Sequence, residues 1–89
     1  MAEERFFLYD EQEQADIRYV SFMGQDSRYD LAIITTDRYY GKKVVMDLQG
    51  SRFAIIGEDD LREKGYLEHA FHLTEIEAEE FREFLFEVL

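Results

Sequence analysis

The chain has 89 residues, of which 21 are acidic and 10 are basic, so its formal net charge at pH 7 is -11. A chain of this length buries only roughly 60 to 65% of the surface that its unfolded form exposes, which allows one modest core and excludes a multi-domain enzyme. Because 46% of the residues are hydrophobic and 16% are aromatic, we expect a single folded domain over residues 1–89 rather than a disordered acidic tail.

Several functions are excluded by residue types and segments that the sequence lacks. Without cysteine there is no disulfide, no thiolate metal site and no cysteine nucleophile. The first residues are acidic where a signal peptide needs basic ones, and the apolar run from Phe6 to Tyr9 is too short for its hydrophobic region. No stretch of about 18 apolar residues is present to span a bilayer. We therefore expect a cytoplasmic protein without membrane contact.

The charge is distributed unevenly along the chain. Residues 17–56 carry six basic and four acidic side chains, a net charge of +2, whereas residues 57–89 carry three basic and eleven acidic ones, a net charge of -8. A sequence-independent nucleic-acid binder presents several bases on one face, and a field this negative repels phosphates. We expect no nucleic-acid partner, and the simplest role of the acidic residues is to keep a small domain soluble.

Five short runs rich in β-branched and aromatic residues predict strands separated by turns. The runs cover residues 5–9, 17–23, 30–36, 43–48 and 52–56. The third run is apolar on both faces, which predicts a position near the centre of the sheet. In the fourth run Val44, Met46 and Leu48 share one face, and the turn that follows contains Gly50, which tolerates the positive φ of a hairpin turn. The spacing is typical of an antiparallel meander.

The period of the apolar residues becomes helical after the last of these runs. Asp59 or Asp60 can cap a short helix that extends to Lys64 and ends at Gly65 as a left-handed stop. We expect the residues between this helix and position 74 to form a connection.

A longer helix is predicted from about residue 75 to the end of the chain. Thr74 and Glu77 have the spacing of a capping box, in which each side chain accepts a hydrogen bond from the other residue's amide. An apolar stripe follows at helical spacing, formed by Ile76, Phe81, Phe84, Leu85 and Val88. Phe86 and Leu89 widen the apolar surface beyond what one sheet face requires, which leaves room for a dimer contact. Residues 84–89 could alternate as a strand instead, but the capping box favours the helix.

The two histidines, His69 and His72, form a candidate metal site. They are three residues apart and have several glutamates near them, and on a helix this spacing places both side chains on one face. The pattern does not match the His-Glu-x-x-His signature, and solvated histidines with nearby acids are common in an acidic chain. The alternative is that both histidines are surface residues of the connection before the long helix.

The preferred contact surface lies in the connection between the third and fourth strands. It gathers polar and aromatic side chains that can recognise an anion or a peptide carboxylate: Asp37, Arg38, Tyr39, Tyr40, Lys42 and Lys43. The alternative is an ordinary hairpin connection in which the tyrosines pack on the rim of the sheet and Asp37 bonds to its own turn.

No motif in the sequence indicates catalysis. The serines and threonines are not in a nucleophile-elbow setting, and no histidine is near them in sequence. Adjacent acids such as Asp59 and Asp60 point to different faces of a helix, and no glycine-rich phosphate loop is present. We assign no catalytic residue and no cofactor, and we leave a small-ligand pocket between sheet and helix as an alternative.

Several runs of the sequence together resemble one family. They are residues 5–10, 20–24, 30–34, 36–42, 50–57 and 65–70. In these runs the chain is similar to small uncharacterised cytosolic proteins of Bacillus- and Staphylococcus-type Gram-positive bacteria, a domain of unknown function. The resemblance implies a stand-alone cytosolic protein and assigns no catalytic residue, cofactor or partner.

The sequence thus predicts an α+β fold, a mainly antiparallel meander of about five strands with the C-terminal helix packed on one face. We expect a small acidic protein that acts as a non-enzymatic protein-interaction or regulatory module, with an unknown protein or a second copy of itself as partner. The alternatives are a divalent-metal-binding protein that uses His69 and His72, and a small-ligand-binding domain.

Overall fold

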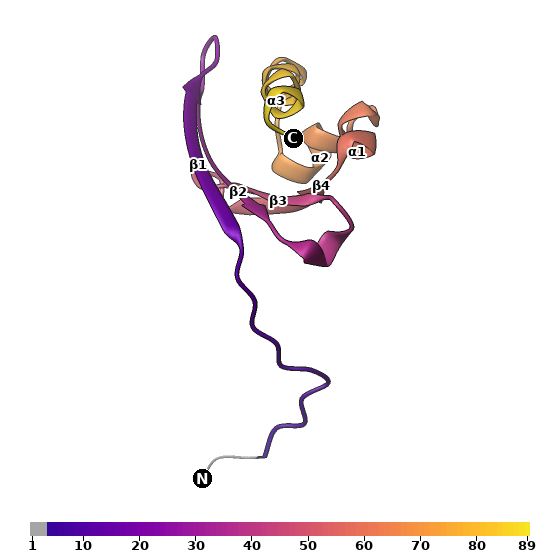
Figure 1. Ribbon diagram of the computed structural model, residues 1–89. Coiled ribbons are helices and arrows are strands. Elements are labelled where there is room, and N and C mark those ends of the chain that lie inside the picture. Colours follow the sequence, from indigo (N-terminus) through magenta and orange to yellow (C-terminus); the bar gives the residue numbers. More distant parts are fainter. Residues whose placement is uncertain (1–3) are drawn as a thin grey trace.

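A computed structural model describes residues 4–89 as a four-stranded antiparallel sheet with helices packed on one of its faces (Figure 1). The strands lie side by side in chain order: β1 (Asp16–Met23), β2 (Arg28–Thr35), β3 (Lys43–Asp47) and β4 (Arg52–Ile56). The helices follow as α1 (Glu58–Arg62), α2 (Tyr66–Phe71) and α3 (Glu75–Val88). The α+β class and the antiparallel meander agree with the prediction, but the sheet has four strands instead of five.

The predicted strand at residues 5–9 is the one that the structure does not contain. Residues 4–15 have no regular secondary structure and run away from the sheet (Figure 1). A strand requires a neighbour for its backbone hydrogen bonds, and within the chain this segment has none. The prediction was wrong because β propensity and alternation describe only the run itself and carry no information about a partner.

β2 lies inside the sheet, as its apolar composition predicted, between β1 and β3. Its odd-numbered side chains Tyr29, Leu31 and Ile33 are buried on the helix side. On the opposite side Ala32 is also buried, because larger side chains of the neighbouring strands surround it. Burial of both faces is the reason this strand has the most continuous apolar sequence.

The turn between β3 and β4 uses a different residue from the one that was expected. Ser51 adopts the left-handed conformation, with φ of 57°, whereas Gly50 does not have a positive φ. A carboxylate oxygen of Asp47 accepts a hydrogen bond from the Gly50 amide at 3.2 Å, and this bond helps to set the turn. A Cβ atom at Gly50 would come within 2.5 Å of that carboxylate, so glycine is favoured there by the close approach of Asp47 rather than by φ.

The segment between the sheet and α3 contains two short helices. α1 begins after Gly57, whose amide donates a hydrogen bond to Asp60 at 2.8 Å, so Asp60 caps the helix from its third position rather than from the cap position. α1 ends at Arg62, two residues earlier than predicted. Gly65 is left-handed, as predicted, with φ of 81°, but it does not end α1. It is instead the N-cap of α2, a helix in the segment where a connection was predicted.

α3 begins at the predicted capping box. The amide of Glu77 donates to the Thr74 hydroxyl at 3.2 Å, and the Thr74 amide donates to the Glu77 carboxylate at 2.9 Å. These bonds satisfy two of the amides that the first turn of a helix leaves without partners. The helix then continues to Val88, which confirms the helical alternative for residues 84–89.

The core lies between α3 and the sheet and is centred on Phe81. Phe81 is fully buried, and its ring is 5.9 Å from that of Tyr29 in β2 and 4.9 Å from that of Phe71 in α2. Leu85 and Ala78 are also fully buried on this side of α3. Ile76 does not belong to the buried stripe, contrary to the prediction, because it lies in the first turn and remains 65% exposed.

Two carboxylates of α3 attach the helix to the β1–β2 hairpin. Glu80 accepts hydrogen bonds from the Tyr29 hydroxyl at 2.9 Å and from the Gln25 amide at 2.5 Å. Glu77 accepts one from the Ser27 hydroxyl at 3.1 Å. Burial, together with the hydrogen bond to Glu80, raises the pKa of Tyr29 above its ordinary value, so the phenol stays protonated and remains a donor.

Truncating Phe81 should remove a large share of the stability. Phe81→Ala is expected to lower the free energy of unfolding by about 3–5 kcal/mol, since it leaves a cavity beside the rings of Tyr29 and Phe71. Ile76→Ala in the same helix is the matched control and should change stability by less than about 0.5 kcal/mol, because its side chain is largely exposed. Urea unfolding followed by circular dichroism measures both. Equal losses in the two variants would contradict this account of the core.

The capping box should make stability depend on pH in the acid range. The Thr74 amide, followed by the Ser27 hydroxyl, lowers the pKa of Glu77 below its ordinary value. A carboxyl with a lowered pKa stabilises the fold above its unfolded-state pKa, and this contribution is lost as the pH falls through the folded-state pKa. Glu77→Gln should therefore be less stable at pH 7 and show a shallower loss of stability below about pH 4.5. Urea unfolding at several pH values measures the free energy of unfolding of the variant and the wild type. The same dependence of this free energy on pH in both proteins would contradict the assignment.

Candidate interaction surface

The sheet has a second face, opposite the helices, that no helix or strand among the described residues 4–89 covers (Figure 1). Two rows of side chains, paired across the strands, form this surface. They are Ile17, Ile34, Val44 and Ile55 in one row, and Tyr19, Ala32, Met46 and Phe53 in the other. We call these eight residues the outer face. Seven of them are apolar, and the eighth is a tyrosine.

The outer face is strongly exposed at its edges. Tyr19 on β1 is 72% exposed and Phe53 on β4 is 66% exposed. Ile17 and Ile55, at the two ends of the first row, are also exposed, whereas the residues of the central strands are at least partly covered by their neighbours. Contiguous apolar surface of this kind is uncommon on a monomer and is characteristic of interaction sites.

Neither row of the outer face contains a formally charged side chain. The nearest charges lie beyond one end of the second row, where Asp30 accepts hydrogen bonds from the Ser21 hydroxyl and the Gln49 amide and pairs with Arg28 at 3.1 Å. The Ser21 hydrogen bond, with help from Arg28, lowers the pKa of Asp30 and keeps it ionised. These partners belong to the same chain, so the Asp30 carboxylate at the polar end of the face already has hydrogen-bond and ion-pair partners.

The predicted contact surface at residues 37–43 is an ordered connection rather than a free cationic loop. A single 3-10 turn, η1 (Asp37–Tyr39), is capped by the Thr36 hydroxyl. Arg38 pairs with Glu11 at 2.9 Å and with Glu13 at 3.4 Å. Lys42 pairs with Asp60 at 3.1 Å, and that carboxylate raises the pKa of the lysine. Two of the three cations proposed for recognition therefore already have carboxylate partners.

The remaining residues of the connection differ in exposure. Asp37 and Tyr40 are exposed, and Tyr40 is left-handed with φ of 53°. Tyr39 is half-buried, and Lys43 begins β3 and lines a groove on the helix side. The role of this connection in recognition stays a prediction.

The two histidines lie on the surface at the end of α2. His69 is in the helix, and His72 follows it as a left-handed C-cap residue with φ of 55°. Both are exposed. Among residues 4–89 the structure brings together no group of three or more histidine or carboxylate side chains that could hold a metal ion. The placement of the pair therefore lends no support to the metal-binding alternative.

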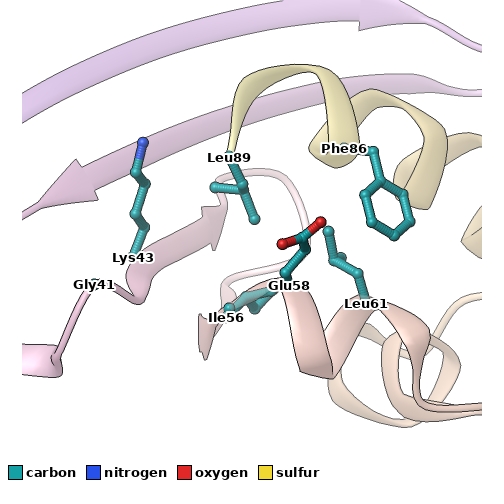
Figure 2. A pocket seen from close by; sticks show the side chains of 8 residues that line it. Gly41, Lys43, Ile56, Glu58, Leu61, Phe86 and Leu89 are labelled. Atoms are coloured by element: carbon teal, nitrogen blue, oxygen red, sulfur yellow. The ribbon is translucent and has the colours of Figure 1, made fainter.

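A groove of about 320 Å³ lies between the end of the sheet, α1 and the end of α3. Figure 2 shows Phe86 and Leu89 extending from the end of α3 toward Leu61 and Glu58 of α1. The ionisable side chains of its lining are Lys43 and Glu58, and Glu58 also pairs with Arg62 at 3.1 Å. The groove thus has a mixed polar and apolar lining without a paired nucleophile and base, and Phe86 and Leu89, the residues predicted to leave room for a dimer contact, form part of it.

Sequence reasoning missed the outer face, although a signal for it was present. The run 52–56 is apolar at four consecutive positions, and the run 17–23 has apolar residues in both of its alternating sets. One amphipathic helix covers only one face of a sheet, so strands apolar on both faces indicate a second contact.

A comparison with protein families matches residues 8–87 to the family described as SAV0927-like. The chain belongs to the SAV0927-like family. This agrees with the resemblance to a small family of unknown function, and the family assigns no activity or site residue to its members. A comparison with curated proteins finds no match. In this SAV0927-like protein the matched residues include the whole sheet, α1, α2 and all of α3 except its last residue. No helix among residues 4–89 is long and apolar enough to cross a bilayer.

Proposed function

We propose that this SAV0927-like protein is a non-enzymatic protein-interaction module that works as a homodimer, with the outer face as the contact surface. The observation that carries the proposal is that two complete rows of side chains on one face of the sheet are apolar or aromatic and that no element among residues 4–89 covers them. Tyr19 and Phe53 supply exposed aromatic side chains at its two edges, and such residues often dominate the energy of an interface.

The absence of charge on the outer face allows a second copy to be the partner despite the net charge of the chain. Two molecules that each carry a net charge of -11 repel each other, and the repulsion is smallest where the touching surfaces carry no charge. The outer face is such a surface. Recognition of a different, charged partner usually relies on complementary charges, and the two rows offer none.

The shape of the surface is also suited to a symmetric contact. In a two-fold dimer the same patch meets itself, so it must be complementary to its own copy. A sheet face with aliphatic and aromatic rows fulfils this requirement, because sheets stack face to face with side chains that interdigitate about 10 Å apart.

Introducing a charge into the outer face should dissociate the dimer. We expect the wild-type protein at high micromolar concentration to sediment with a mass near twice 10.7 kDa. Phe53→Glu should sediment as a monomer, because the new carboxylate would be buried without a partner. Tyr40→Glu, at a fully exposed position away from the face, is the matched control and should remain dimeric.

Circular dichroism confirms that each variant is folded before its mass is compared. A wild-type protein that is monomeric at these concentrations, or a Phe53→Glu variant as dimeric as the wild type, would overturn the proposed function.

A further inference from the structure

The N-terminal arm, which we define as residues 5–9, is a second apolar surface, and its side chains are more than half exposed from Phe6 to Tyr9. Phe6 is 93% exposed and Leu8 is 90% exposed, and Phe7 and Tyr9 are more than half exposed. Exposure of four consecutive large side chains of this kind to water is unfavourable, and exposed apolar patches are characteristic of interaction sites. The run also has the alternation and composition of a strand, which the chain itself does not pair.

The base of the arm is held in a defined direction. Arg38 of η1 pairs with Glu11 and Glu13, and its guanidinium lies 5.3 Å from the centre of the Tyr9 ring. From this anchor the arm leads away from the sheet of its own chain (Figure 1). To cover its own outer face, the arm would have to reverse its direction beyond Arg38, whereas a neighbouring molecule can meet it as it stands.

The size of the outer face indicates that something must supplement it. The face comprises eight residues, in two rows across four strands. A stable interface of standard size involves about 20–30 residues on each side, so the face alone falls well short. The arm adds three exposed aromatic side chains and a leucine, which are large side chains of the kind that bury most area in interfaces.

We infer that the dimer is completed by exchange of arms, in which Phe6–Tyr9 of each copy pack against the margin of the outer face of the other copy. The inference rests on the proposed function, since it requires that the outer faces meet. The outer face of the other copy supplies the apolar surface that the arm lacks within its own chain. Arg38 positions the arm by holding its base.

Paramagnetic labelling of mixed dimers tests the exchange directly, because the chain has no cysteine of its own. A Leu8→Cys chain carrying a nitroxide is mixed with a wild-type chain labelled at its isoleucine methyl groups. We expect signal loss at Ile17, Ile34 or Ile55 of the labelled copy that exceeds the loss at Ile33 and Ile56 on the helix side. A nitroxide on Glu63→Cys, at the exposed end of α1, is the matched control and should not give this pattern.

The sample in which the signal is lost decides whether the arm packs on the sheet of another copy or on its own sheet. Loss in the mixed sample supports exchange between copies. Loss that occurs only when the nitroxide and the labelled methyl groups share one chain would show that the arm covers its own sheet, and it would overturn the inference. The absence of any loss in a sample that sediments as a dimer would also overturn it, while leaving the proposed function intact.

Substitutions in the arm provide a second measurement that does not depend on labels. Phe6→Ser combined with Leu8→Ser should weaken dimerisation at least about tenfold in sedimentation equilibrium, because each copy loses two buried apolar side chains. Gln12→Ser combined with Gln14→Ser, just beyond the arm, is the control and should leave the dissociation constant unchanged. Equal dissociation constants for the arm variant and the wild type would contradict the exchange.

Discussion

One-sided burial is the constraint on which the rest of the structure depends. The sheet is held together by packing against α3, whose buried residues Ala78, Phe81 and Leu85 face the strands, and α1 and α2 join the same layer. All three helices come after the last strand in the chain, and they occupy the same side of the sheet (Figure 1). The helices therefore bury apolar side chains on one face of the sheet and leave the other face without a covering layer.

The composition of the strands does not follow this asymmetry. If the outer face were designed for water, its positions would carry polar residues in alternation with the buried ones. Ser21 and Asp30 show this pattern at one end of the sheet, but the two apolar rows do not. In the proposed dimer, the arm and the outer face are the surfaces where copies meet, whereas the acidic residues are concentrated in the helical half of the chain.

The local parts of this structure were readable from the sequence. The capping box at Thr74 and Glu77, the left-handed Gly65 and the central position of β2 each depend on a few neighbouring residues, and their chemistry determines the outcome. The features that failed depend on distant residues. The run at residues 5–9 has strand-like composition without a strand beside it, and Ile76 has helical spacing without a surface above it.

The candidate site shows the same division. The basic residues of the connection after β2 appeared available because their partners are remote in sequence: Arg38 pairs with Glu11, 27 residues away, and Lys42 pairs with Asp60 on α1. Conversely, the outer face emerges only when the register places side chains from four strands in rows. The sequence shows which residues each strand contains, but only the register of the paired strands shows that Tyr19 and Phe53 belong to one surface.

The central claim is that the uncovered face of the sheet, and not the helix layer, mediates association. Isoleucine methyl groups provide matched probes on both sides of the same strands, because Ile34 and Ile55 lie on the outer face while Ile33 and Ile56 are buried on the helix side. In a dilution series followed by methyl NMR, the account predicts concentration-dependent shifts at Ile34 and Ile55 with constant positions for Ile33 and Ile56. Shifts confined to the core pair, or spectra that do not change with concentration, would contradict it.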